Sequence, residues 1–350
     1  MKKFSLLIAL LGIFVVGCST DESTPEPSKP SNGVPHNEIW YTSTDGNIVE
    51  PSLGASYDSE ASEMKSFGAN IISNTYEDGK GVITFDGDVK YITSGAFYGC
   101  ETLNAVTVPE CITEITQGAF NYCSNLTSFD IPDSVTELGV QAFGSCKALE
   151  SVTIGKGVKS IGHAAFFMCT SLTSITIPEN VTSFGTYPFG KCVNLEEFRG
   201  SYAAENGKLL ICNGTLAALA PKGMTECIIP DGITVINAGA LAYCTGLTYV
   251  SIPESVTTVG SNAFYGCQSL TELYFPANVN SIGDYAFVMS SNLQKVYFES
   301  VTPPTPVPNS YGGWNVFDYT SAKIYVPKES IDAYKSAEHW NLYADRIKGF

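Results

Sequence analysis

The chain has 350 residues, enough for one large domain or two ordinary ones, and its composition excludes several classes of protein. Hydrophobic residues make up 44% of the sequence, which suffices for a sizeable core, so the chain as a whole is not disordered. Its 19 basic residues face 35 acidic ones, and a formal charge of −16 argues against binding nucleic acid. Three histidines leave little material for a histidine-based metal site or acid–base centre.

Residues 1–17 have the features of an export signal. Lys2 and Lys3 precede an apolar run over residues 6–16, which is too short for a bilayer span of about 20 residues. The run ends in Val-Val-Gly directly before Cys18, and this arrangement resembles the lipobox of bacterial lipoproteins. The resemblance implies removal of a signal peptide over residues 1–17 and lipidation at Cys18. The alternative is an ordinary signal peptide followed by an unrelated cysteine.

Residues 18–37 combine Cys18 with a segment rich in Ser, Pro and acidic residues, which we expect to be a flexible tether. The acidic pair Asp21-Glu22 resembles the tag that some Gram-negative bacteria use to export lipoproteins to the outer face. We therefore predict a protein held to the outer membrane by its lipid anchor only, at the surface of a Gram-negative cell. A location on the periplasmic face is the alternative.

The body of the chain is one repeat used about ten times. The most regular position of the repeat holds a large apolar residue, usually with an alanine before it. Most of its occurrences are 23 residues apart: Phe97, Phe120, Phe143, Phe166, Phe189, Leu241, Phe264, Phe287 and Phe317. In most coils a cysteine follows after three residues and a leucine after three more, as in Cys169 and Leu172. The unit reads I-P-x-x-V-T-x-I-G-x-x-A-F-x-x-C-x-x-L-T-x-V-x.

A period of 20–29 residues with an L-x-x-L-x-L kernel is typical of leucine-rich repeats. The kernel alternates like a strand, and equivalent strands of stacked coils pair in parallel. We therefore predict an α/β-type leucine-rich-repeat solenoid, dominated by β-structure, with about ten coils over residues 86–327. One step spans 52 residues and contains the favoured turn Asn213-Gly214, so we expect a β-hairpin projecting near residues 206–221.

Both ends lack the repeat and are expected to cap the solenoid. Residues 38–85 are predicted to form an N-terminal β cap, with a hairpin over residues 38–49 that turns at Asp45-Gly46. Residues 328–350 are predicted to form a C-terminal helical cap. Its helix would begin at Ser330 as N-cap and turn three residues inward: Ile331, Tyr334 and Trp340.

The repeat unit resembles the BspA-like leucine-rich repeat family, and the segment from Tyr325 to Trp340 resembles that family's usual ending. The resemblance covers residues 38–350, although Ser290 and Thr320 stand where a cysteine is usual. It implies a bacterial cell-surface protein, and some members bind host extracellular-matrix proteins or other bacteria. It implies no catalytic motif.

Eleven cysteines in an exported chain usually indicate disulfides. Seven of them, however, occupy the same place in their coils, where a small buried side chain packs well, and we interpret them as core thiols. Disulfides within this ladder are the alternative. No C-x-x-C pair occurs, and we expect neither a metal nor another cofactor. His163 and Cys169 are separated by only six residues, but we interpret Cys169 as one more core thiol.

The second and fourth residues after each kernel leucine point to the exposed face of the sheet. These positions are small and hydroxylic in the first half of the chain. In the second half they carry aromatic and basic residues that we predict to bind a partner: Tyr249, Tyr274, Tyr297, Tyr325, Lys295 and Lys323. Exposed tyrosines give a large contact area at low entropic cost, although tyrosine is also simply common in strands.

These features predict a non-catalytic surface lipoprotein that binds protein partners, such as host matrix proteins, along the concave face of the sheet. The alternative is a glycan-capture accessory of a nutrient-uptake system, in which the same tyrosines stack on sugars. An enzyme that works at the 206–221 hairpin or through Cys169 is a third interpretation. The acidic charge favours a neutral or basic partner.

Overall fold

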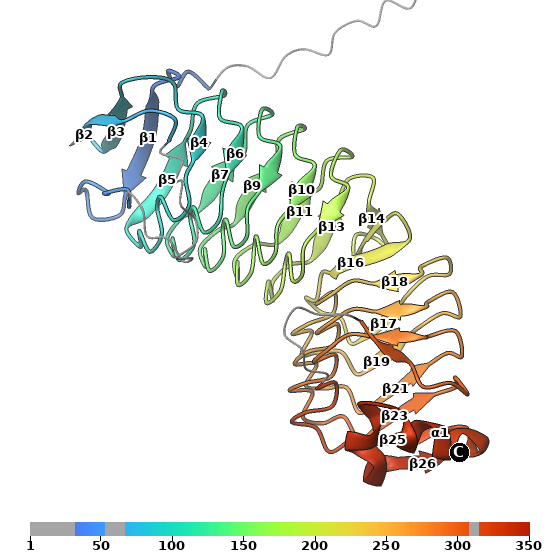
Figure 1. The fold of residues 1–350 in the computed structure, drawn as a ribbon. Coiled ribbons are helices and arrows are strands. Elements are labelled where there is room, and N and C mark those ends of the chain that lie inside the picture. The colour runs from blue at the N-terminus through green and yellow to red at the C-terminus, as the bar shows by residue number, and fades with distance from the viewer. Residues whose placement is uncertain (1–31, 53–66, 308–314) are drawn as a thin grey trace, which may run out of the picture. The chain divides into compact units, whose positions relative to one another are not determined.

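In the computed structural model, which describes residues 32–52, 67–307 and 315–350, each repeat folds into one coil with two short strands. Most equivalent strands of successive coils pair in parallel, and the strands line up in two ladders along the stack (Figure 1). This confirms the predicted solenoid, which has about eleven coils and very little helix. The expected signal peptide, Cys18 and most of the tether lie outside the described residues.

The kernel ladder contains the strands formed by the L-x-x-V-x-V kernels and the last strand of the chain. In order they are β5 (Leu103–Thr107), β7 (Ser128–Asp130), β9 (Ser151–Thr153), β11 (Ser174–Thr176), β13 (Glu197–Arg199), β17 (Glu226–Ile228), β19 (Tyr249–Ser251), β21 (Glu272–Phe275), β23 (Lys295–Phe298), β25 (Lys323–Val326) and β26 (Ile347–Gly349). Their middle residues, such as Val152 and Ile175, are buried, while their neighbours on either side face solvent or are half-buried. The alternation predicted from the sequence is therefore confirmed.

The short ladder contains the two-residue strands of the V-T-x-I-G segments and one strand of the insert. It consists of β4 (Tyr91–Ile92), β6 (Glu114–Ile115), β8 (Glu137–Leu138), β10 (Ser160–Ile161) and β12 (Ser183–Phe184), and then of β16 (Thr215–Leu219), β18 (Val235–Ile236), β20 (Thr258–Val259), β22 (Ser281–Ile282) and β24 (Thr305–Pro306). The two parts belong to different sheets, because β12 and β16 do not pair.

Stacked phenylalanine rings form the centre of the core. The rings of Phe97 and Phe120 lie 5.2 Å apart and 1° from parallel, and those of Phe143 and Phe166 lie 5.5 Å apart at 4°. Several coils carry a glycine after the short strand, and there the backbone of the preceding coil leaves no room for a side chain. A Cβ atom added at Gly162 would lie 2.6 Å from the carbonyl oxygen of Leu138 in the preceding coil, which no side chain tolerates.

The N-terminal cap is an antiparallel sheet of β1 (Glu38–Ser43), β2 (Ile71–Glu77) and β3 (Lys80–Phe85), joined to β5 through β1. The predicted hairpin over residues 38–49 is wrong, because β1 pairs with β3 on one side and β5 on the other. A turn does form at Asp45, whose carboxylate accepts the Asn47 N–H at 3.1 Å. The chain after it buries Val49, whose N–H donates to the Tyr41 hydroxyl at 3.2 Å, so it cannot return as a strand beside β1.

The insert contains the predicted hairpin, formed by β15 (Leu209–Cys212) and β16 around Asn213 and Gly214, which have φ values of 50° and 72°. The hairpin does not project from the solenoid, as the sequence had suggested. Instead β16 pairs in parallel with β18, and β14 (Ala203–Ala204) pairs with β15. Both hairpin strands are largely apolar, and burying Leu210 and Leu216 draws them into the stack. The hydrophobic core divides into two clusters at this insert.

The C-terminal cap consists of the 3₁₀ turn η1 (Lys328–Ser330), helix α1 (Ile331–Ser336), the 3₁₀ segment η2 (Trp340–Arg346) and β26. Tyr334 and Trp340 are buried as expected, and the Trp340 indole donates to the Pro304 carbonyl at 2.8 Å. Ser330 precedes α1, but its hydroxyl makes no capping bond and is buried without a partner among the described residues. None of the helices in the described part is long and apolar enough to cross a membrane.

Candidate functional site

Three tyrosines form a column on the exposed face of the kernel ladder. Strands β21, β23 and β25 pair in a register that aligns Tyr274 with Tyr297 and Tyr297 with Tyr325. The rings of the first pair are parallel with centroids 4.4 Å apart, and those of the second pair lie 4.8 Å apart at 18°. These spacings match the distance between paired strands, so the parallel register itself stacks the rings. We call Tyr274, Tyr297 and Tyr325 the tyrosine column.

Phe350 extends this aromatic surface. Its ring meets that of Tyr297 edge to face, with centroids 5.8 Å apart and an angle of 82°, and its N–H donates to the Val326 carbonyl at 3.1 Å. Half of Phe350 is exposed to solvent. The sequence did not point to this residue, because β26 has no kernel motif and its pairing with β25 follows from the fold of the cap.

A charged row lies beside the column at the other outward position of each strand. It contains Glu272, Lys295 and Lys323, of which Lys295 is in register with both of the others. The Lys295 ammonium forms a 2.5 Å ion pair with Glu272, and the Tyr274 hydroxyl donates to the same carboxylate at 3.0 Å. The structure thus brings together five of the six predicted residues. Tyr249 lies on β19, in register with Glu226, and it is in register with neither the row nor the column because β19 and β21 are not paired.

These contacts shift the protonation equilibria of the three groups in a consistent way. The hydrogen bonds from Lys295 and Tyr274 hold the pKa of Glu272 below its usual value, and the bond to Glu272 raises the pKa of Lys295. The same carboxylate raises the pKa of Tyr274 to about 12, because ionising the phenol would break its hydrogen bond and add a second negative charge. At neutral pH Glu272 is therefore a carboxylate, Lys295 an ammonium and Tyr274 a neutral phenol.

The cysteine ladder has a structural role that the sequence did not reveal. The Cys169 thiol donates to the carbonyl oxygen of Phe143 at 3.2 Å, and the Cys146 thiol donates to that of Phe120 at 3.1 Å. The cysteines of the described residues are free thiols. Cys169 is wholly buried, and burial raises its pKa well above the usual value, so it lacks the exposure and low pKa of a nucleophile. His163 contacts the ring of Tyr187 at a centroid distance of 6.0 Å.

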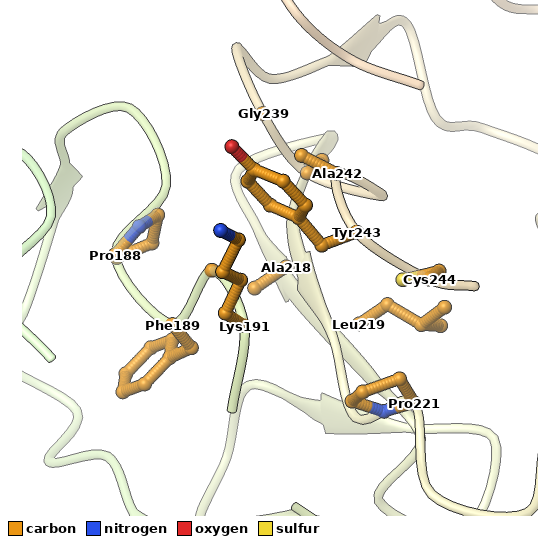
Figure 2. A pocket seen from close by; sticks show the side chains of 12 residues that line it. Pro188, Phe189, Lys191, Ala218, Leu219, Pro221, Gly239, Ala242, Tyr243 and Cys244 are labelled. Atoms are coloured by element: carbon orange, nitrogen blue, oxygen red, sulfur yellow. The ribbon is translucent and has the colours of Figure 1, made fainter. Parts of the chain in front are cut away.

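A narrow pocket lies at the insert, where the coil that contains Phe189 meets the coil of Leu241 (Figure 2). In a regular coil the aromatic N–H bonds the next coil, as Phe166 does with Pro188 at 2.9 Å. Among the described residues, the N–H groups of Phe189 and Lys191 have no such acceptor. The Lys191 ammonium lies 4.2 Å from the centroid of the Tyr243 ring. About 10 Å³ remains inside, which suits one water molecule and no larger ligand.

The fold and its repeat define the class of this protein: a parallel-stranded leucine-rich-repeat solenoid. The model of the BspA type leucine rich repeat region matches residues 73–199 and 218–323 in six copies, more than half of the chain. The chain therefore belongs to the BspA-type leucine-rich repeat family. A comparison with curated proteins finds no significant match.

Among solved structures, the chain is similar to a leucine-rich repeat protein from Eubacterium ventriosum, with 23% identity, a TM-score of 0.53 and coverage of 74% of this chain and 77% of that one. This likeness supports the fold. The pneumococcal vaccine antigen PcpA is 18% identical over 80% of this chain and 86% of its own, with a TM-score of 0.48. A leucine rich cell surface protein from Faecalibacterium prausnitzii is 23% identical over 65% and 80%, with a TM-score of 0.41.

Proposed function

We propose that this chain is a non-catalytic surface protein that recognises protein partners through the tyrosine column and the adjoining charged row. The stacked geometry of Tyr274, Tyr297 and Tyr325 is the observation that carries the proposal. Stacking fixes the rings before a partner arrives, so little side-chain entropy remains to be lost on binding. Tyrosines held in this way provide large, amphipathic contacts of the kind that dominate protein interfaces.

The same geometry favours a protein partner over a sugar at the column. A sugar that stacks on an aromatic side chain needs a free ring face. Both faces of Tyr297 are covered, one by Tyr274 and the other by Tyr325. The column therefore offers ring edges and hydroxyl groups along its length, and these suit the mixed apolar and polar surface of a protein.

The charges around the column bear on the kind of partner. Glu272 and Lys295 neutralise each other, and Lys323 adds a positive charge beside them. The chain as a whole carries a charge of −16, so a neutral or basic partner meets the least long-range repulsion. A host matrix protein fits this description, and adhesion is the role that we propose for the interaction.

We further propose that the protein is displayed at the surface of a Gram-negative cell by lipidation of Cys18. The lipobox-like sequence before Cys18 and the Ser/Pro-rich tether over residues 18–37 support this arrangement. A relative in the solved structures is described as a cell surface protein. Several acyl chains on one residue make a stable anchor, and the tether would hold the solenoid clear of the membrane.

The test is binding of the full chain to arrayed host matrix proteins, with polysaccharides on the same array. A variant with Tyr274, Tyr297 and Tyr325 changed to Ala is compared with one in which Asp130, Thr153 and Thr176 are changed to Ala. The second set occupies the same outward position on β7, β9 and β11. We expect a matrix protein to bind the wild type and the second variant. Binding should be lost only in the first variant. Equal binding by all three would contradict the proposal.

A further inference from the structure

A second cleft lies on the short ladder, where the insert interrupts it. Strand β12 pairs with β10 and is the last strand of its sheet, whereas β16 pairs with β15 and β18. The space between β12 and the hairpin forms an open cleft of about 240 Å³, lined by side chains from both. This volume is slightly below the range of pockets that hold drug-sized ligands, so the cleft suits a smaller molecule such as one sugar ring.

The interruption leaves hydrogen-bond acceptors exposed on one wall of the cleft. In the preceding coil, the carbonyl oxygen of Lys159 accepts the Thr182 N–H at 2.9 Å, and that of Ile161 accepts the Gly185 N–H at 2.8 Å. The equivalent acceptors one coil further on are the carbonyls of Thr182 and Phe184. Among the described residues, no N–H reaches Thr182, and Phe184 receives only a 3.4 Å contact from the Asn237 amide. Donors from a ligand would complete this pattern.

The other lining groups are uncharged and rich in hydrogen-bonding capacity. Hydroxyl groups come from Thr182, Ser183 and Thr215, amide groups come from Asn213 and Asn237, and Phe184 adds an aromatic side chain. None of the side chains that line the cleft is a carboxylate, an ammonium or a guanidinium. A charged ligand would find no opposite charge here, whereas a neutral polyhydroxylated ligand can both donate and accept hydrogen bonds.

We infer that this cleft binds one neutral sugar unit of a carbohydrate chain. Hydroxyl groups of the sugar donate to the carbonyl oxygens of Thr182 and Phe184, and the hydroxyl and amide side chains of the hairpin bind its other face. The site is formed by the short ladder and the insert, so it is separate from the tyrosine column on the kernel ladder. The inference therefore goes beyond the proposed protein-binding function and does not depend on it.

The test uses the full chain and ligand-observed saturation-transfer NMR with glucose, galactose, mannose and N-acetylglucosamine, and with glucuronate as a charged comparison. Ser183→Trp places an indole in the cleft. Ser160→Trp is the matched control, because Ser160 pairs with Ser183 in register but does not line the cleft. We expect saturable binding of at least one neutral sugar, weakened at least about tenfold by Ser183→Trp and unchanged by Ser160→Trp.

A second variant guards against a folding defect in Ser183→Trp. Thr215→Val keeps the shape of the side chain and removes one hydroxyl. It should weaken the binding of the same sugar while the melting temperature stays near that of the wild type. The inference is overturned if no neutral sugar binds or if both Trp variants bind the sugar with equal affinity. It is also overturned if glucuronate binds as tightly as glucose, its neutral counterpart. Binding that Tyr297→Ala abolishes and Ser183→Trp preserves would also overturn it, because the sugar would then lie at the tyrosine column.

Discussion

The Ser290 hydroxyl donates to the carbonyl oxygen of Phe264 at 2.8 Å, in the place where cysteine thiols of other coils make the equivalent bond. Cys267, one coil earlier, donates to the Leu241 carbonyl at 3.1 Å. In these coils the position therefore requires a small buried group that can donate one hydrogen bond to the coil before it, whereas Thr320 donates to Phe317 of its own coil. Serine meets this requirement, which explains why Ser290 replaces cysteine without disturbing the stack.

Removing this donor should cost stability in proportion to the bond that is lost. Cys169→Ala loses both packing and the bond to Phe143, whereas Cys244→Ala loses packing only, since the Cys244 thiol has no such acceptor among the described residues. We expect Cys169→Ala to be more destabilising by about 1 kcal/mol, the usual net value of one hydrogen bond. Thermal melts of the two variants check this difference. Equal melting temperatures would show that the bond contributes nothing.

Thiol accessibility separates the buried cysteines from the two half-buried ones, Cys111 and Cys100. Cys100 is the first member of the ladder, so the interpretation of all seven ladder cysteines as buried core thiols is wrong at this end of the stack. In native protein with Cys18 changed to Ser, a disulfide reagent should label only Cys100 and Cys111 at an appreciable rate. Burial raises the pKa of Cys100 to about 11, so its thiolate fraction and labelling rate should rise about tenfold per pH unit from pH 8 to pH 10. Counting labelled thiols by mass spectrometry checks the result. Rapid labelling of Cys169 would revive the interpretation that it is a nucleophile.

Gly162, which follows the short strand β10, should tolerate no side chain. Gly162→Ala places a methyl group against the backbone of the preceding coil and must push the two coils apart. We expect a loss of roughly 2 kcal/mol or more, as for other changes that overpack a core. Gly87→Ala is the control, because the nearest atom to an added Cβ there is Ala69 Cβ, at an ordinary 3.6 Å. Similar melting temperatures for the two variants would contradict the packing argument.

Lipidation of Cys18 can be tested by fractionation of cells. A Cys18→Ser variant should leave the membrane fraction and should no longer incorporate a labelled fatty acid, because its anchor is missing. Cys111→Ser is the control for loss of a cysteine elsewhere in the chain. Membrane retention of the Cys18→Ser variant would remove the proposed anchor, although the solenoid and its binding faces would be unaffected.

The local pattern of the sequence predicts which residues of each coil turn inward, but it does not predict which segments become neighbours. The alternation of buried and exposed residues around Val152 and Ile175 depends only on the strand that contains each of them. The same alternation in the later strands predicts that the tyrosines point outward. The residues of the candidate site could therefore be proposed before the fold was known. The stacking of Tyr297 on both sides follows from a parallel register, which the repeat length also implies.

The errors lie where pairing depends on distant partners. The segment after β1 resembles the second strand of a hairpin, but β3 and β5 supply longer partners, and Val49 is needed in the core. The insert hairpin carries apolar residues on both strands, so it enters the stack and does not project. The pairing of β26, and with it the position of Phe350, depends on how the cap folds back, which no local pattern encodes.

The most direct test of the proposed function is the affinity of the Tyr297→Ala variant for a matrix protein captured by the wild type. Tyr297 lies at the centre of the column, in contact with Tyr274, Tyr325 and Phe350. We predict that binding weakens at least about tenfold, as expected for a central aromatic contact, while Thr153→Ala on β9 leaves it unchanged. If Tyr297→Ala binds within about twofold of the wild type and melts at the same temperature, the tyrosine column is not the recognition surface.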